Sequence, residues 1–227
     1  MLRPAILIAL GAVIVAVAVV LIVMEPVPVE AGLREWLAAG ERRLAWADEL
    51  LFFGILCWGA GATALCSRPR ERASLGRRVG TTALVVALAA LLIVLLAIGR
   101  LVYPISDHSM SDDALTLLVD TTFGALHLAM LGFGVSAIAL TGLSAGDRVR
   151  PLRVIVGCVL GIAFIAGSFP WLTPTWWNVS AAVLLGAWGL LLASAANESL
   201  LERSEPPTVP GGSASVGEPK STSPTEI

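Results

Sequence analysis

Ionisable side chains within long apolar stretches are the residues of this sequence that could do chemistry. Asp120 and His127 lie seven residues apart in one such stretch, and Arg100 closes the preceding one. This spacing predicts that Asp120 and His127 share a helix face, two turns or roughly 10 Å apart. A direct hydrogen bond cannot span that distance, so a water or a group from another helix would have to bridge them. Gly124 and Gly134 continue the same face and would let a neighbouring helix approach closely.

Arg100 and Asp120 would fall at comparable depth on consecutive antiparallel helices. An ion pair between them is the simplest way to neutralise both, either as a bundle-specifying contact or as part of a ligand site or proton path. His127 alone is more typical of an interhelical hydrogen bond than of a ligand. The candidate polar site of the sequence therefore comprises Arg100, Asp107, Asp120 and His127.

No constellation of known catalytic or cofactor-binding type surrounds these residues. Haem-b proteins use paired intramembrane histidines, but only His127 is deep, since His108 lies in a loop. The three cysteines are scattered, without the clustering that zinc sites need. The stretch 132–136 matches the glycine-serine pattern of intramembrane serine proteases only weakly. We therefore expect no catalytic residue set, no metal and no cofactor.

Six apolar segments must position these residues. Of the 227 residues, 56% are hydrophobic and only 14% are charged, whereas soluble domains carry about 25% charged residues. The apolar runs match a hydrocarbon core of roughly 30 Å. Residues 202–227 are rich in Pro, Ser, Gly and Thr, which predicts a disordered cytoplasmic tail after a membrane domain over 1–201. The sequence thus predicts an all-α polytopic integral membrane bundle of six transmembrane helices, at about 5–24, 49–66, 80–102, 115–143, 154–170 and 178–197.

Basic residues indicate the orientation of these segments. With six crossings, one side of the membrane carries Arg3, Arg68, Arg70, Arg72, Arg77, Arg78, Arg148, Arg150, Arg153, Arg203 and Lys220. An arginine excess marks the cytoplasmic side, so we expect a multi-pass plasma-membrane protein with both termini in the cytoplasm. The first segment is longer than the apolar region of a signal peptide and is expected to stay as an uncleaved helix. The arginine links lack interleaved aromatic residues, which predicts contacts with anionic lipid and none with nucleic acid.

Four tryptophans are expected at the outer boundary of the bilayer. The link 25–47 has apolar residues near helical spacing, which predicts a short amphipathic helix. It would lie in the interface with Trp36 at headgroup depth, or else pack over the outer end of the bundle. Trp171, Trp176 and Trp177 in the last outer loop fit an aromatic belt, with a sugar- or lipid-binding platform as the alternative.

The layout of the third to sixth segments resembles a known family. The third segment runs into Pro104-x-x-Asp107, a loop rich in Ser and Asp follows, and the fourth segment carries His127-Leu128 near its middle. With a short basic turn and two closing helices, this is similar to a prokaryotic family of six-helix membrane proteins known as domain of unknown function 998. The resemblance spans about residues 5–200. It implies that Pro104, Asp107 and His127 are the family's positions, and it implies no reaction.

Three functions remain open from the sequence. The first is a non-enzymatic membrane component, either an accessory subunit of a partner membrane protein or a bundle that binds a small ligand or membrane lipid. The second is a proton-coupled transporter that uses the outward-facing cluster of arginine, aspartate and histidine around Asp120. The third is an intramembrane enzyme acting on lipid-linked substrates at the outer face, with its acid or base drawn from Asp107, Asp112, Asp113 and His127.

Overall fold

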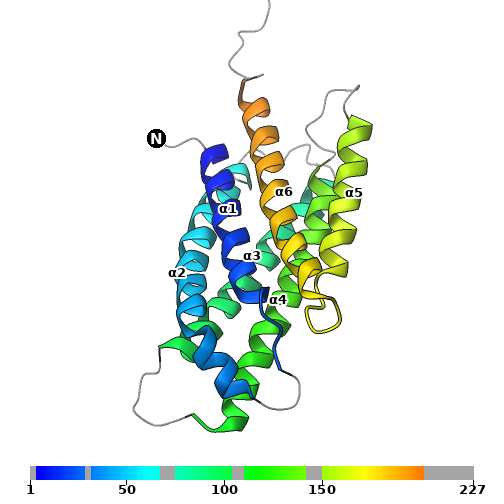
Figure 1. The fold of residues 1–227 in the computed structure, drawn as a ribbon. Coiled ribbons are helices and arrows are strands. Elements are labelled where there is room, and N and C mark those ends of the chain that lie inside the picture. Colours follow the sequence, from blue (N-terminus) through cyan, green and yellow to red (C-terminus); the bar gives the residue numbers. More distant parts are fainter. Residues whose placement is uncertain (1–3, 29–31, 67–74, 104–109, 142–149, 202–227) are drawn as a thin grey trace, which may run out of the picture.

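The computed structural model describes residues 4–28, 32–66, 75–103, 110–141 and 150–201 (Figure 1). This part of the chain contains helices joined by turns and no strands, and each predicted apolar segment overlaps one helix, which confirms the all-α prediction. The tail 202–227 lies outside the described residues. The six helices are α1 (Pro4–Val23), α2 (Leu33–Cys66), α3 (Leu75–Val102), α4 (Asp112–Leu140), α5 (Arg150–Ala166) and α6 (Thr175–Leu201).

The lengths and compositions of these helices suit a bilayer. Five of them, α1, α2, α3, α4 and α6, are long and apolar enough to cross a membrane. The exception is α5, whose 17 residues extend about 26 Å at the rise of an α-helix. The described part of the chain is therefore compatible with a multi-pass membrane protein.

Local signals in the sequence start α2, α4 and α6. Ser111 caps α4, and its hydroxyl oxygen accepts a hydrogen bond of 3.3 Å from the Ala114 N–H, while Asp112 adds a negative charge to the first turn. Gly32 has φ of 89°, a left-handed conformation that other residues avoid, and it leads the chain into α2. Pro174 precedes α6, where its missing N–H is no loss.

Each helix runs antiparallel to its neighbour in sequence, and the six form a ring. The ring closes because α6 packs against α1, so that the first and last helices lie side by side (Figure 1). The helices α2, α4 and α6 begin at one end of the ring, which we call the cavity end. At the opposite end, the terminal end, α1 begins and α6 finishes.

The amphipathic helix expected within 25–47 is not a separate element. It is the first half of α2, which continues for 34 residues and about 51 Å. No proline interrupts this stretch, and its alanines, leucines, glutamates and arginines all favour helix. Leu44 and Ala47 are buried, and Trp36 packs against the core. The first half of α2 therefore packs on the bundle, as the alternative interpretation of this link predicted.

An aromatic cluster fills the centre of the ring. The ring of Trp58 on α2 stacks on Phe133 of α4, with 5.1 Å between centroids, and lies 5.8 Å from Trp188 of α6. Phe164 of α5 contacts Trp188 edge-on at 6.2 Å. All four side chains are fully buried. We call these four side chains the aromatic layer. They join α2, α4, α5 and α6 at a level that is about halfway along α1.

Small residues bring α3 and α4 into backbone contact. The buried Ser136 hydroxyl of α4 donates a hydrogen bond of 3.0 Å to the Gly80 carbonyl of α3. A Cβ atom on Gly132 would lie 2.9 Å from the Ala83 carbonyl oxygen. The glycine-serine stretch 132–136 is thus explained by helix packing, which leaves Ser136 bound to a carbonyl rather than placed as a nucleophile.

The two glycines expected to bring a neighbouring helix close behave differently. A Cβ atom on Gly134 would lie 2.9 Å from the Gly161 carbonyl oxygen of α5, so this prediction is confirmed. Around Gly124 no described atom lies within 4 Å of the corresponding position, so the same prediction is wrong there. The reason is that α5 approaches α4 near Gly134, whereas Gly124 lies on an exposed face of α4.

Candidate functional site

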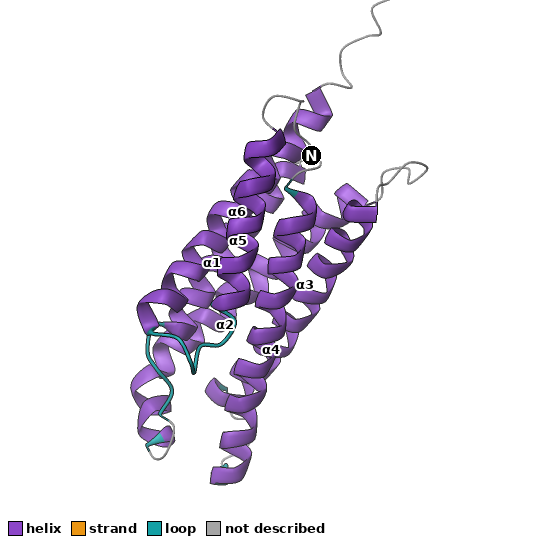
Figure 2. Ribbon diagram, turned by 90° about the vertical axis from the view of Figure 1, so that its right-hand side faces the viewer, coloured by secondary structure: helices purple, strands orange, loops and turns teal. Residues whose placement is uncertain are grey.

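A cavity of about 790 Å³ lies at the cavity end of the ring. It forms because α2 and α4 extend beyond the end of α1 and the turn between α5 and α6 (Figure 2). The first turns of α2 and α4 make two walls. The connection that follows α1 and the α5–α6 turn close the space from the side of the ring.

The walls of this cavity combine apolar and charged side chains. Apolar and aromatic contacts come from Val23 of α1, Leu115, Val119 and Phe123 of α4, and Trp171 of the α5–α6 turn. Charged and amide groups line the same space. They are Glu25, Arg34, Glu35, Asp112, Asp120 and Asn178.

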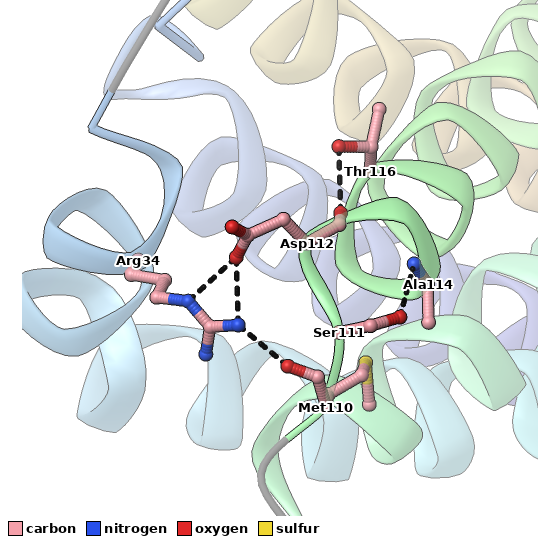
Figure 3. Close-up of polar contacts among 6 residues, drawn as sticks. All are labelled: Arg34, Met110, Ser111, Asp112, Ala114 and Thr116. Carbon is pink, nitrogen blue, oxygen red and sulfur yellow. Dashed lines mark hydrogen bonds and ion pairs between the residues drawn. The ribbon is translucent and has the colours of Figure 1, made fainter.

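An ion pair joins the two walls at the rim. The Arg34 Nε–H of α2 donates a hydrogen bond of 2.7 Å to Asp112 Oδ1 of α4, and an Arg34 NH2 group donates one of 2.5 Å to the Met110 carbonyl (Figure 3). The two side chains are 52% and 82% exposed. Pairs this exposed stabilise a fold by about 0–1 kcal/mol. The contact therefore orients the start of α2 against the start of α4 more than it stabilises the bundle.

A second arginine holds the connection after α1. Arg43 NH2 of α2 lies 2.9 Å from Glu25 Oε2, and the Arg43 side chain is only 12% exposed. The guanidinium also lies over the ring of Trp36, 5.9 Å from its centroid, at a distance suited to a cation–π contact. Glu25 and Asp112 are thus each neutralised by an arginine.

Asp120 differs from the other carboxylates of the cavity. Glu35 and Asp112 lie in the first turns of α2 and α4, where free N–H groups favour negative charge. Asp120 lies two turns further along α4, on the face that also carries Thr116 and Phe123. Within the described residues, Asp120 has no ion pair or hydrogen bond. It is the carboxylate of this cavity that neither a helix start nor an arginine accounts for.

The predicted ion pair between Arg100 and Asp120 is wrong. No such pair joins them in the part of the chain that the structure describes. Arg100 occupies the last turn of α3 and is exposed on the same outward face as Leu96, which is 70% exposed. Asp120 instead faces the cavity. The rotations of the two helices about their axes, rather than their depths, keep the charges apart.

Asp120→Asn is therefore expected to leave the fold intact. Because no cation is left unpaired, the free energy of unfolding should stay within about 0.5 kcal/mol of the wild type. An ion pair with Arg100 would instead predict a loss of several kcal/mol, since one charge would lose its partner. Denaturant unfolding in micelles measures the difference. A loss above about 2 kcal/mol would contradict this assignment.

His127 lies one turn deeper in α4 than Phe123. Its Nδ1 atom is 2.9 Å from the Ser168 carbonyl oxygen, and because a carbonyl only accepts, Nδ1 carries the proton. Phe169 and Trp171 flank the imidazole, with centroids 4.5 and 5.8 Å away. His127 thus forms the expected hydrogen bond, but its partner belongs to the α5–α6 turn rather than to another helix. Through Trp171, His127 supports the cavity wall without lining it.

Asn178 fixes the shape of the α5–α6 turn, and the sequence did not single it out. Its side chain is 6% exposed. The Thr173 hydroxyl donates a hydrogen bond of 2.5 Å to Asn178 Oδ1, and Asn178 Nδ2 donates one of 3.2 Å to the Pro170 carbonyl. A buried amide with satisfied donors and acceptors rigidifies a turn. The only signal in the sequence was a lone asparagine where an apolar segment begins.

The tryptophans expected at a membrane boundary divide into two kinds. Trp171 and Trp176 are 55% and 65% exposed, as an aromatic belt requires. Trp36 is half-buried, and the indole N–H of Trp177 is buried. On α2 the exposed tryptophan is Trp46, at 61%, which the sequence did not single out.

Other predicted residues fall outside the cavity. Asp107 and Pro104 lie outside the described residues. Asp113 is exposed and does not line the cavity. Across the described ranges, no group of three or more His, Cys, Asp or Glu side chains is placed to hold a metal ion.

Comparison of the chain with protein-family models, curated protein sequences and solved structures found no match. The resemblance to the six-helix family therefore stays a prediction.

Proposed function

We propose that this chain is a multi-pass plasma-membrane protein that binds a small molecule or lipid in the cavity without catalysing a reaction on it. All six helices cross the bilayer in this proposal, and the terminal end faces the cytoplasm. Arg77 and Arg78 in the first turn of α3 lie at that end, as the bias of cytoplasmic loops toward arginine requires. The cavity then opens toward the outer side.

The size and lining of the cavity carry this proposal. A volume of about 790 Å³ falls within the roughly 300–1,000 Å³ of small-molecule sites. Such sites combine apolar and aromatic walls with a few polar groups that orient the ligand. Phe123 and Trp171 supply the aromatic walls, and Asp120 and Thr116 supply polar groups. Binding of this kind is compatible with an accessory role beside a partner membrane protein.

The interior of the ring favours binding over proton-coupled transport. Carriers have their substrate sites near the midplane, between two halves that move. Here the aromatic layer occupies the centre of the ring, and Trp58 and Phe133 are fully buried there. Catalysis is also disfavoured, because Asp112 is neutralised by Arg34, and His127 does not line the cavity.

A cavity-filling substitution tests the proposal. Thr116 lines the cavity, and a tryptophan there should displace the ligand. The protein is extracted from its membrane into polymer nanodiscs without detergent, and the bound molecules are identified by mass spectrometry. We expect a molecule that co-purifies with the wild type and is depleted several-fold in Thr116→Trp.

Thr121→Trp is the matched control for this experiment. Thr121 lies on the same helix, is exposed and does not line the cavity. Its hydroxyl, like that of Thr116, donates to the carbonyl four residues earlier. The control should keep the co-purifying molecule. Identical sets of bound molecules in both variants would refute the binding function.

A further inference from the structure

We infer that the cavity binds an organic cation, an ammonium group carried on an apolar body, with Asp120 as its counter-ion. This rests on the proposed function and deepens it by assigning a ligand class. The cavity, the unpaired carboxylate and the aromatic walls support it together.

The balance of charge around the cavity leaves a negative excess. Four carboxylates and one arginine line it. Asp112 is paired with Arg34, and Glu25 with Arg43 from behind the wall. Glu35 lies at the rim, in the first turn of α2, where the helix start compensates its charge. Asp120 is left with neither form of compensation.

Asp120 lies next to apolar side chains and is exposed to the space that they enclose. Val119 precedes it, Phe123 follows one turn later, and both face the same space. The Asp120 side chain is exposed to the cavity, so a ligand that enters this space can reach the carboxylate directly. Ionisable groups on helices that cross a membrane often mark a ligand or ion site. A ligand ammonium would supply the missing positive charge.

The aromatic walls suit the same class of ligand. Phe123 and Trp171 line the cavity from two different elements. Aromatic faces attract cations, and the attraction grows as water is excluded. Phe169 and His127 pack around Trp171 and restrict its ring. Val23 and Leu115 offer apolar contact to the remainder of the ligand.

Three small probes with the same alkyl chain test the assignment. They are hexyltrimethylammonium, neutral 1-hexanol and anionic hexanesulfonate. Each is titrated calorimetrically into the full-length protein in phosphatidylcholine nanodiscs, with empty nanodiscs as the blank. The wild type should bind the cation more tightly than the other two. Asp120→Asn should weaken cation binding about tenfold, since it removes the negative charge that attracts the quaternary ammonium, which has no N–H and binds through its charge alone.

Two further variants separate the role of Asp120 from general effects of charge. Asp113→Asn makes the same change of charge on the same helix outside the cavity, and it should bind the cation like the wild type. Asp120→Glu keeps the carboxylate and should retain most of the affinity. The denaturant unfolding of Asp120→Asn shows separately whether that variant is folded.

The possible results distinguish this inference from the proposed function. If 1-hexanol or hexanesulfonate binds the wild type as tightly as the cation, the cavity is a ligand site but the cation class is wrong. The same holds if Asp120→Asn keeps its affinity, or if Asp113→Asn loses as much. Absence of cation binding to the wild type overturns the inference as well. The proposed function is refuted only by the separate comparison of Thr116→Trp with Thr121→Trp.

Discussion

Replacement of Trp58 by alanine is expected to lower the free energy of unfolding by about 3–5 kcal/mol. Trp58 is fully buried at the centre of the aromatic layer, where it contacts Phe133 of α4 and Trp188 of α6. Removing its ring leaves a void among α2, α4 and α6, each of which is held by close contacts with α1 or α3, so the void cannot collapse completely. Unfolding in mixed micelles, followed by circular dichroism, measures the loss.

Two other substitutions show whether burial is the cause. Trp46→Ala removes the same ring from the same helix, but Trp46 is 61% exposed, so stability should change by less than about 1 kcal/mol. Trp58→Phe should cost less than Trp58→Ala. The indole N–H of Trp58 has no hydrogen-bond partner within the described residues, so only volume is lost. Equal losses in Trp46→Ala and Trp58→Ala would mean that the aromatic layer does not hold the ring of helices together.

The helices themselves could be predicted from the sequence, because each rests on a long local signal. The predicted segment 5–24 and the observed α1 differ by one residue at each end. Pro26 and Pro28 follow this helix. A proline inside a helix lacks the backbone N–H and clashes with the preceding turn, so the helix ends before them. The same reasoning missed the continuity of α2, because the charged residues between 34 and 43 suggested a separate amphipathic helix ahead of the apolar segment 49–66. Arginine and glutamate are polar but are strong helix formers, so their presence does not end a helix.

The cavity could not be predicted, because it depends on how each helix is rotated and where its neighbours end. Arg34 and Asp112 are 78 residues apart in the sequence, and neither the length of α2 nor the position of α4 is a local property. Arg100 and Asp120 were expected to pair on the grounds of depth alone. Depth follows from counting residues, but the direction of a side chain follows from which face of its helix is packed. Asp120 was recognised as a candidate because an acid within an apolar segment is rare.

The glycines also show that a sequence pattern does not decide which face of a helix is packed. Gly124 and Gly134 were equivalent in the sequence, yet only Gly134 touches a neighbouring helix. Helix α1 is the extreme case, because it is apolar on every side and its sequence marks no packed face. Its packed face is set by Gly54 and Gly61 of α2, whose missing side chains admit Val15 and Ile8.

Gly11 of α1 is a glycine whose substitution should be strongly destabilising. A Cβ atom there would lie 2.8 Å from both the Gly54 carbonyl oxygen and the Trp58 Cα atom of α2, and closer still to the Trp58 backbone nitrogen. Backbone atoms cannot rotate away, so Gly11→Ala must push α1 from α2. We expect a loss of about 1–3 kcal/mol, the usual cost of overpacking, even though alanine favours helix by about 1 kcal/mol. Micelle unfolding again measures it.

Gly124→Ala separates this clash from any general effect of placing alanine in a helix. It makes the same change within α4, where no described atom lies within 4 Å of the new methyl group, so stability should stay the same or rise slightly. Because Gly11 meets the backbone of Trp58 rather than its ring, Trp58→Ala should not relieve the cost of Gly11→Ala. If the double variant were more stable than the sum of the two losses predicts, the indole ring would be the obstacle. The contact between α1 and α2 would then depend on the aromatic layer, whereas the backbone distances make it independent of that layer.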